Sequence, residues 1–77
     1  MTLFYFDIKT GEDYYDEVGT DLANRAEARQ EALAVLAPIA GEQMPADANY
    51  SVCVTVRDQN KRPIFHASLS VVEDWIE

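Results

Sequence analysis

The sequence predicts an α+β fold in which one helix packs across one face of an antiparallel four-stranded sheet. Two observations predict it. Apolar residues alternate with polar ones near both ends of the chain, as they do in strands, and they recur at helical spacing in between. The order of elements is therefore β-β-α-β-β. A chain of 77 residues has room for one hydrophobic core, so we expect residues 1–77 to form a single α+β domain.

The first hairpin begins with residues 3–8, which are rich in aromatic and branched side chains that alternate between two faces. Residues 9–13 have the composition of a turn, and Tyr14 and Tyr15 begin a short returning strand. We expect Gly19 to adopt a positive φ, which a side chain would resist. We also expect the carboxylate of Asp16 to accept hydrogen bonds from amides of this turn.

The helix is predicted to begin at Asn24, because Asn24 and Glu27 have the spacing of a capping box. Pro38 removes a helical hydrogen bond and predicts a kink or an end, and Gly41 is a natural terminus before a loop over residues 42–49. One apolar stripe follows the helical period and is expected to face the sheet. It consists of Ala28, Ala32, Val35, Leu36 and Ile39.

The second hairpin occupies the last third of the chain. Valines alternate with other residues over 52–57, and an apolar alternation resumes over residues 65–71. The intervening turn spans residues 58–61, in which Asn60 best tolerates a left-handed conformation.

Charge and cysteine content exclude several classes of partner. Fourteen acidic and six basic residues give a net charge of −8, whereas a nucleic-acid binder needs a basic stripe. The acidic residues concentrate in residues 7–21 and 73–77, and three of the six bases fall within residues 57–62. Cys53 is the single cysteine, no basic leader precedes the first strand, and the longest apolar run is too short to cross a membrane. We therefore expect a cytoplasmic protein that contacts neither nucleic acid nor membrane.

Five short segments along the chain carry a resemblance to a known family. They are Tyr5-Phe6-Asp7-Ile8, Gly11, Asp16-Glu17-Val18-Gly19 with Leu22, Ala28-Arg29-Gln30-Glu31-Ala32, and Val54-Thr55-Val56-Arg57-Asp58. In these segments the sequence resembles a family of short, uncharacterised bacterial domains of unknown function. The final hairpin turn has Asn60-Lys61 where that family often has glycine. The resemblance implies a fold and a bacterial cytoplasmic setting, and it brings no activity and no functional residues.

His66 is the single histidine, so a proton shuttle of the usual kind would have to use it. Alternation points it away from the core, beside Cys53 or Thr55. A Cys53–His66 pair could form a thiolate nucleophile, but no third orienting group and no oxyanion-hole motif accompany it. The acidic run lacks the spacing of a calcium loop, and no glycine-rich phosphate motif occurs. We therefore predict a protein that is not an enzyme, with no catalytic residues, no metal and no cofactor.

The most informative feature is the sheet face that the helix cannot cover. Its large apolar members and its lack of central charges predict a contact surface through which two copies pack sheet to sheet. The expected contact residues are Leu3, Tyr5, Cys53, Thr55, Ile64 and His66, with Ser68 and Ser70 beside them. Trp75 has two open placements: over the end of the core, or exposed among acidic residues as an anchor for a partner.

The main functional hypothesis is therefore a small, non-enzymatic protein-protein interaction module that forms a homodimer. One alternative is an acidic, antitoxin-like or nucleic-acid-mimicking regulator that binds a basic protein through its carboxylates. The other alternative is a small hydrolase or metal protein that uses His66.

Overall fold

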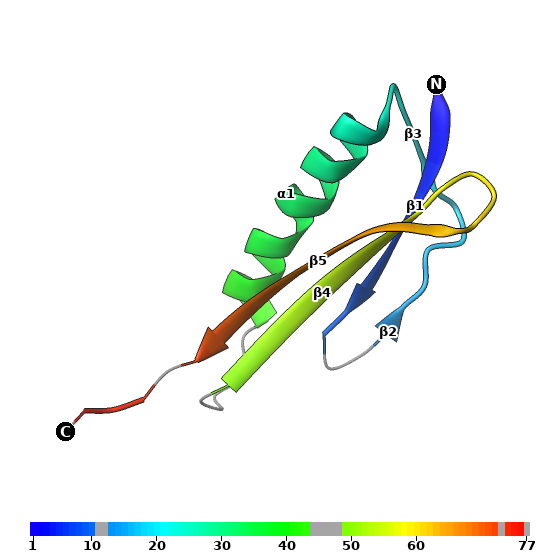
Figure 1. The fold of residues 1–77 in the computed structure, drawn as a ribbon. Helices are drawn as coiled ribbons and strands as arrows, with labels where there is room; N and C mark the ends of the chain where they lie inside the picture. Colours follow the sequence, from blue (N-terminus) through cyan, green and yellow to red (C-terminus); the bar gives the residue numbers. More distant parts are fainter. Residues whose placement is uncertain (11–12, 44–48, 73, 77) are drawn as a thin grey trace.

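The computed structural model describes residues 1–10, 13–43, 49–72 and 74–76. One helix lies across one face of an antiparallel sheet, which confirms the α+β prediction (Figure 1). The strands run in the order β2-β1-β4-β5, and β3 pairs with β1. The elements are β1 (Thr2–Lys9), β2 (Asp13–Tyr14), β3 (Thr20–Leu22), α1 (Arg25–Gln43), β4 (Asn49–Arg57) and β5 (Pro63–Val72).

The sheet has five strands where four were expected, because the returning half of the first hairpin is interrupted. β2 pairs with the end of β1, β3 pairs with its beginning, and residues 15–19 connect them. Gly19 has a φ of +80°, as predicted. A Cβ atom at Gly19 would lie 2.8 Å from Leu3 Cδ1 and 3.1 Å from the Phe4 carbonyl oxygen, so this turn requires glycine for space as well as for conformation.

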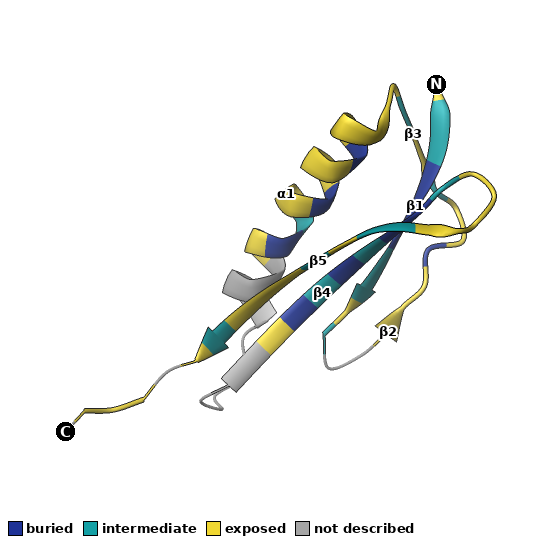
Figure 2. Cartoon of the chain, in the orientation of Figure 1, coloured by how far each residue is buried: buried dark blue, intermediate teal, exposed yellow. Residues whose placement is uncertain are grey.

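The core lies between α1 and the central strands. Figure 2 shows the buried residues of α1 on the side that faces the sheet. The predicted stripe is confirmed in its described part: Ala28, Ala32 and Leu36 are buried and Val35 is half-buried. The side chain of Ile39 lies outside the described residues. The helix packs against buried strand residues that are Phe4 and Phe6 of β1 and Val52, Val54 and Val56 of β4.

The helix begins as predicted and ends later than predicted. Asn24 Oδ1 accepts a hydrogen bond from the Glu27 N–H at 3.0 Å, which is the expected N-terminal cap. A kink or an end was predicted at Pro38, and the end is wrong, since α1 continues past Pro38 to Gln43, two residues after the predicted terminus at Gly41. Pro38 and Ala34 are both exposed, so the Ala34 carbonyl that loses its helical partner can bond to water instead. No helix in the described ranges combines the length and the hydropathy that a membrane span requires.

The turn between β4 and β5 differs from the expectation in one residue. Lys61, and not Asn60, has a positive φ, of 65°. The Lys61 N–H donates to the Asp58 carbonyl at 2.8 Å, which closes a four-residue turn over 58–61 and places its last residue in the left-handed region. The Asp58 carboxylate accepts hydrogen bonds from the N–H groups of Asn60 and Arg62, which stabilises this arrangement.

Candidate functional site

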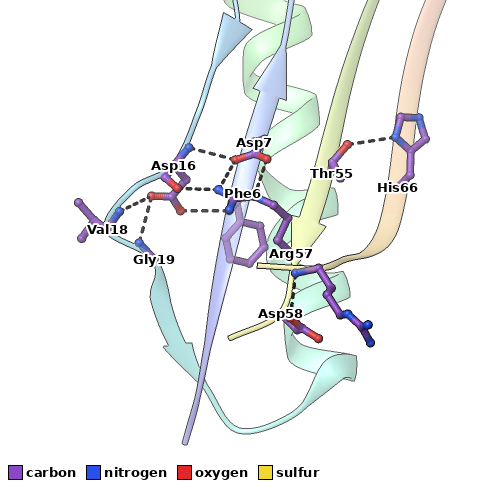
Figure 3. Close-up of polar contacts among 10 residues, drawn as sticks. Phe6, Asp7, Asp16, Val18, Gly19, Thr55, Arg57, Asp58 and His66 are labelled. Atoms are coloured by element: carbon purple, nitrogen blue, oxygen red, sulfur yellow. Dashed lines mark hydrogen bonds and ion pairs between the residues drawn. The ribbon is translucent and has the colours of Figure 1, made fainter. Parts of the chain in front are cut away.

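The open face of the sheet, which points away from α1, carries three of the predicted candidate residues: Cys53, Thr55 and His66. Strand pairing places Asp7 of β1, Thr55 of β4 and His66 of β5 in one row across this face. Thr55 Oγ1 and His66 Nδ1 lie 3.3 Å apart and form a hydrogen bond (Figure 3). The prediction that His66 lies beside Cys53 or Thr55 is therefore confirmed for Thr55.

A hollow of about 270 Å³ occupies the middle of the open face. It is lined by Tyr14 and Tyr15, at the end of β2, and by Cys53 and Thr55 of β4. Its lining consists of Asp7, Ile8, Lys9, Asp13, Tyr14, Tyr15, Cys53, Thr55 and His66. Cys53 is half-buried and carries a free thiol. Both tyrosines are exposed.

A buried arginine closes the neighbouring part of the open face. Arg57 is only 4% exposed, and its Nε and Nη2 atoms donate to the two carboxylate oxygens of Asp7 at 2.7 and 2.9 Å. Nη2 also donates to the Asp16 carbonyl at 2.7 Å. The guanidinium carbon lies 4.9 Å from the ring centroid of Tyr5 and 4.1 Å from that of Tyr15. We call Tyr5, Asp7, Tyr15, Asp16 and Arg57 the arginine cluster; its paired charges and stacked rings hold the β2 segment against β1.

The carboxylate of Asp16 fills the gap in the sheet between β2 and β3. Its Oδ2 accepts a hydrogen bond from the Phe6 N–H at 3.0 Å, and its Oδ1 accepts from Val18 and Gly19 at 3.0 Å each (Figure 3). The Asp16 N–H in turn donates to Asp7 Oδ1 at 3.0 Å. The predicted bonds to turn amides are thus confirmed, and the bond to Phe6 shows that this side chain also replaces a missing strand carbonyl.

These contacts shift two pKa values. Burial by itself would raise the pKa of Asp16, but the hydrogen bonds from Phe6, Gly19 and Val18, together with the charge of Arg57, outweigh burial and lower that pKa. The hydrogen bond to Asp7 raises the pKa of Arg57 in spite of its burial. Both side chains are therefore held in their charged forms. Within the described residues, Arg57 Nη1 is buried and has no hydrogen-bond partner.

Two of the predicted contact residues do not lie on an uncovered surface. Tyr5 is only 7% exposed, because Arg57 and Lys61 both lie over its ring. Ile64 packs against the core from the helix side, since the register of β4 and β5 shifts after the Val56–Phe65 pair. The expectation that both side chains stand free on the open face is therefore wrong.

The other four predicted residues have different degrees of exposure. Leu3, Cys53 and Thr55 are half-buried, and His66 is exposed. Thr55 and His66 are brought together by strand pairing, and Cys53 shares the hollow with them. Leu3 lies at the other end of β1, where it contacts the segment around Gly19.

Sequence reasoning missed the arginine cluster. Asp7 and Arg57 lie on the open face, and opposite charges on one face are a signal that two side chains pair. Nothing local predicted the stacking of Tyr15 on Arg57, because the two residues are 42 positions apart in the sequence. Trp75 is 96% exposed, so the placement over the end of the core is excluded.

The polar side chains in the row of His66 have partners within the chain. A neutral hydroxyl, Thr55, holds His66, and the carboxylate in the same row, Asp7, is bound by Arg57 through both of its oxygens. In the part of the chain that the structure describes, no group of three His, Cys, Asp or Glu side chains is placed to hold a metal ion.

A family model described as "Domain of unknown function (DUF6894)" matches residues 3–70. No curated protein and no solved structure matches the chain. The matched span runs from β1 into β5 and includes the hollow and the arginine cluster. The resemblance to a family of domains of unknown function is therefore confirmed, and the chain belongs to the DUF6894 family.

Proposed function

We propose that this domain is a non-enzymatic protein-interaction module that associates with a second copy of itself through the β4–β5 side of its sheet. One observation carries the proposal: no described strand or helix covers the open face or the outer edge of this side, and the buried Arg57 is the one Lys, Arg, Asp or Glu residue of β4 and β5, in a molecule whose net charge is −8. Apart from the buried Arg57, β4 and β5 present no Lys, Arg, Asp or Glu side chain on the open face. Cys53, Thr55, His66, Ser68 and Ser70 lie on this face.

The half of the sheet that contains β1 supports the proposal by contrast. There β2, β3 and the arginine cluster already cover β1, so that side offers no comparable free surface. The binding of Asp7 by Arg57 supports a non-enzymatic role, because it occupies the carboxylate that stands in one row with His66. We also propose a bacterial cytoplasm as the setting, which fits the free thiol of Cys53.

The oligomeric state in solution tests this proposal. Light scattering across a size-exclusion peak, at low and at high micromolar concentration, is expected to give a mass that approaches twice 8.7 kDa. A mass that stays at that of one chain at the highest concentration would overturn it.

A further inference from the structure

β5 forms an open edge of the sheet. It is the last strand in the order β2-β1-β4-β5, and β4 is its one neighbour among the strands that the structure describes (Figure 1). In an antiparallel pair, alternate residues of each strand turn their N–H and C=O groups away from the partner strand. Along the ten residues of β5, these outward groups form a ready template for another strand.

The devices that normally protect a sheet edge are missing from β5. Natural edge strands are short, or they carry charged residues, proline or a bulge in their middle. From Pro63 to Val72 there is no Lys, Arg, Asp or Glu, the proline is the first residue, and the register shift lies at the same end. The remaining length of β5 therefore offers an edge that can pair without obstruction.

Comparison of the edge with the open face favours the edge as the contact. Packing of two sheets face to face needs large apolar side chains on both inner faces. Arg57 covers Tyr5 and the register shift removes Ile64, so the β4–β5 part of the open face retains mainly small polar residues. Pairing at the edge needs no such side chains, because main-chain hydrogen bonds provide the affinity.

The charges at the two ends of β5 identify the partner and its direction. Exposed Lys61 and Arg62 precede the strand, and exposed Asp74 follows it. A second copy in the antiparallel direction sets the basic end of each strand against the acidic end of the other, whereas a parallel arrangement would set like charges together. A register centred on Ser68 places Arg62 opposite Asp74 of the partner subunit.

We infer that β5 pairs antiparallel with β5 of a second copy, so that two sheets join edge to edge into one continuous sheet. This inference rests on the proposed self-association and specifies its geometry. The twofold axis is perpendicular to the sheet, so both helices lie on the same face of the joined sheet. The exposed Trp75 and Ile76 then run beside the basic turn of the partner, which gives these apolar side chains a neighbour.

Hydrogen exchange of the full chain distinguishes edge pairing from face packing. Alternate amides of β5 are expected to gain protection as the concentration rises through the dimerisation range, while the intervening amides are already protected by β4. Trp75 is the single tryptophan, so its emission is expected to shift to shorter wavelength over the same range. A dimer in which no amide of β5 gains protection would overturn the edge contact.

Charge exchange tests the direction and the register. Arg62→Glu and Asp74→Arg, each alone, are expected to weaken the dimer by about tenfold, because each places like charges opposite one another at both ends of the joint. The double variant Arg62→Glu/Asp74→Arg is expected to restore wild-type affinity. Both residues are exposed, so the fold of each subunit should not change. Failure of the double variant to recover affinity would overturn the antiparallel register.

Thr55→Lys separates the two proposals, with Gln30→Lys on the exposed side of α1 as a control of equal charge. Edge pairing predicts that both variants remain dimeric. A dimer that Thr55→Lys dissociates and Gln30→Lys does not would overturn the edge geometry and leave self-association standing. A wild-type chain that is monomeric throughout would overturn both.

Discussion

The two edges of this sheet differ in how the hydrogen-bonding groups of their backbone are satisfied. At the β1 edge, two short strands and the Asp16 carboxylate provide partners for the backbone, and Arg57 locks the segment in place. At the β5 edge, the chain provides no such cover in the part that the structure describes. The comparison teaches that a side chain can substitute for a strand where a turn interrupts the sheet, and that an edge without such a side chain keeps backbone groups that another strand can pair with.

The largest effect on stability is expected for substitution of Arg57, which holds the segment after β2 against β1. Arg57→Ala removes two bonds to Asp7, one bond to Asp16 and the contacts with two tyrosine rings, and it leaves Asp7 without its counter-charge. We expect the free energy of unfolding to fall by about 3–5 kcal/mol. Urea denaturation measures the loss, and Arg29→Ala, at an exposed position of α1, serves as the control. If the two variants lose equal stability, the arginine cluster does not hold the edge.

A smaller loss is expected for Asp16→Ala, which leaves the Phe6 N–H buried without its acceptor and also frees the amides of Val18 and Gly19. We expect a cost of about 2–4 kcal/mol, together with faster exchange of the Phe6 amide than of other β1 amides. Asp13→Ala, at an exposed position of β2, is the matched control. Unchanged exchange at Phe6 would show that the carboxylate does not replace a strand carbonyl.

The pH dependence of stability also tests the contribution of the Asp16 carboxylate to the fold. The pKa of Asp16 is lower in the folded chain than its ordinary value of 3.8, so its contribution is fully present above that value. This contribution is lost as the pH falls through the lower folded-state pKa. Unfolding experiments between neutral and acidic pH should show a smaller acid-induced loss for Asp16→Asn than for the wild type. Parallel curves for the two proteins would contradict this assignment.

The smallest effect is expected at the turn beside the β5 edge. Lys61 has a left-handed conformation that favours glycine, so Lys61→Gly should stabilise the chain by about 0.5–1 kcal/mol. Gln59→Gly, in the same turn, should not stabilise it, because the structure gives Gln59 no positive φ. A rise in thermal midpoint for the first variant alone would confirm the turn geometry.

The sequence predicted the layers because alternation and helical spacing record which side of each element faces the core. It also predicted the Asp16–Gly19 turn and the Asn24 cap, because these depend on neighbours close in sequence. It did not predict the placement of Tyr5 or Ile64. One depends on Arg57, far along the chain, and the other on a shift of register that alternation cannot reveal.

The buried alanines of α1 limit the substitutions that the core of this domain can accept. Ala32 is fully buried and Ala28 nearly so, and both belong to the same core cluster as Val52, Val54 and Val56. Larger residues there would lift the helix off the sheet. Space remains at one margin, where a hollow of about 340 Å³ lies between the first turn of α1 and the start of β5. Additional apolar volume from new mutations can therefore be accommodated beside Ile64 and Phe65, and not at the centre.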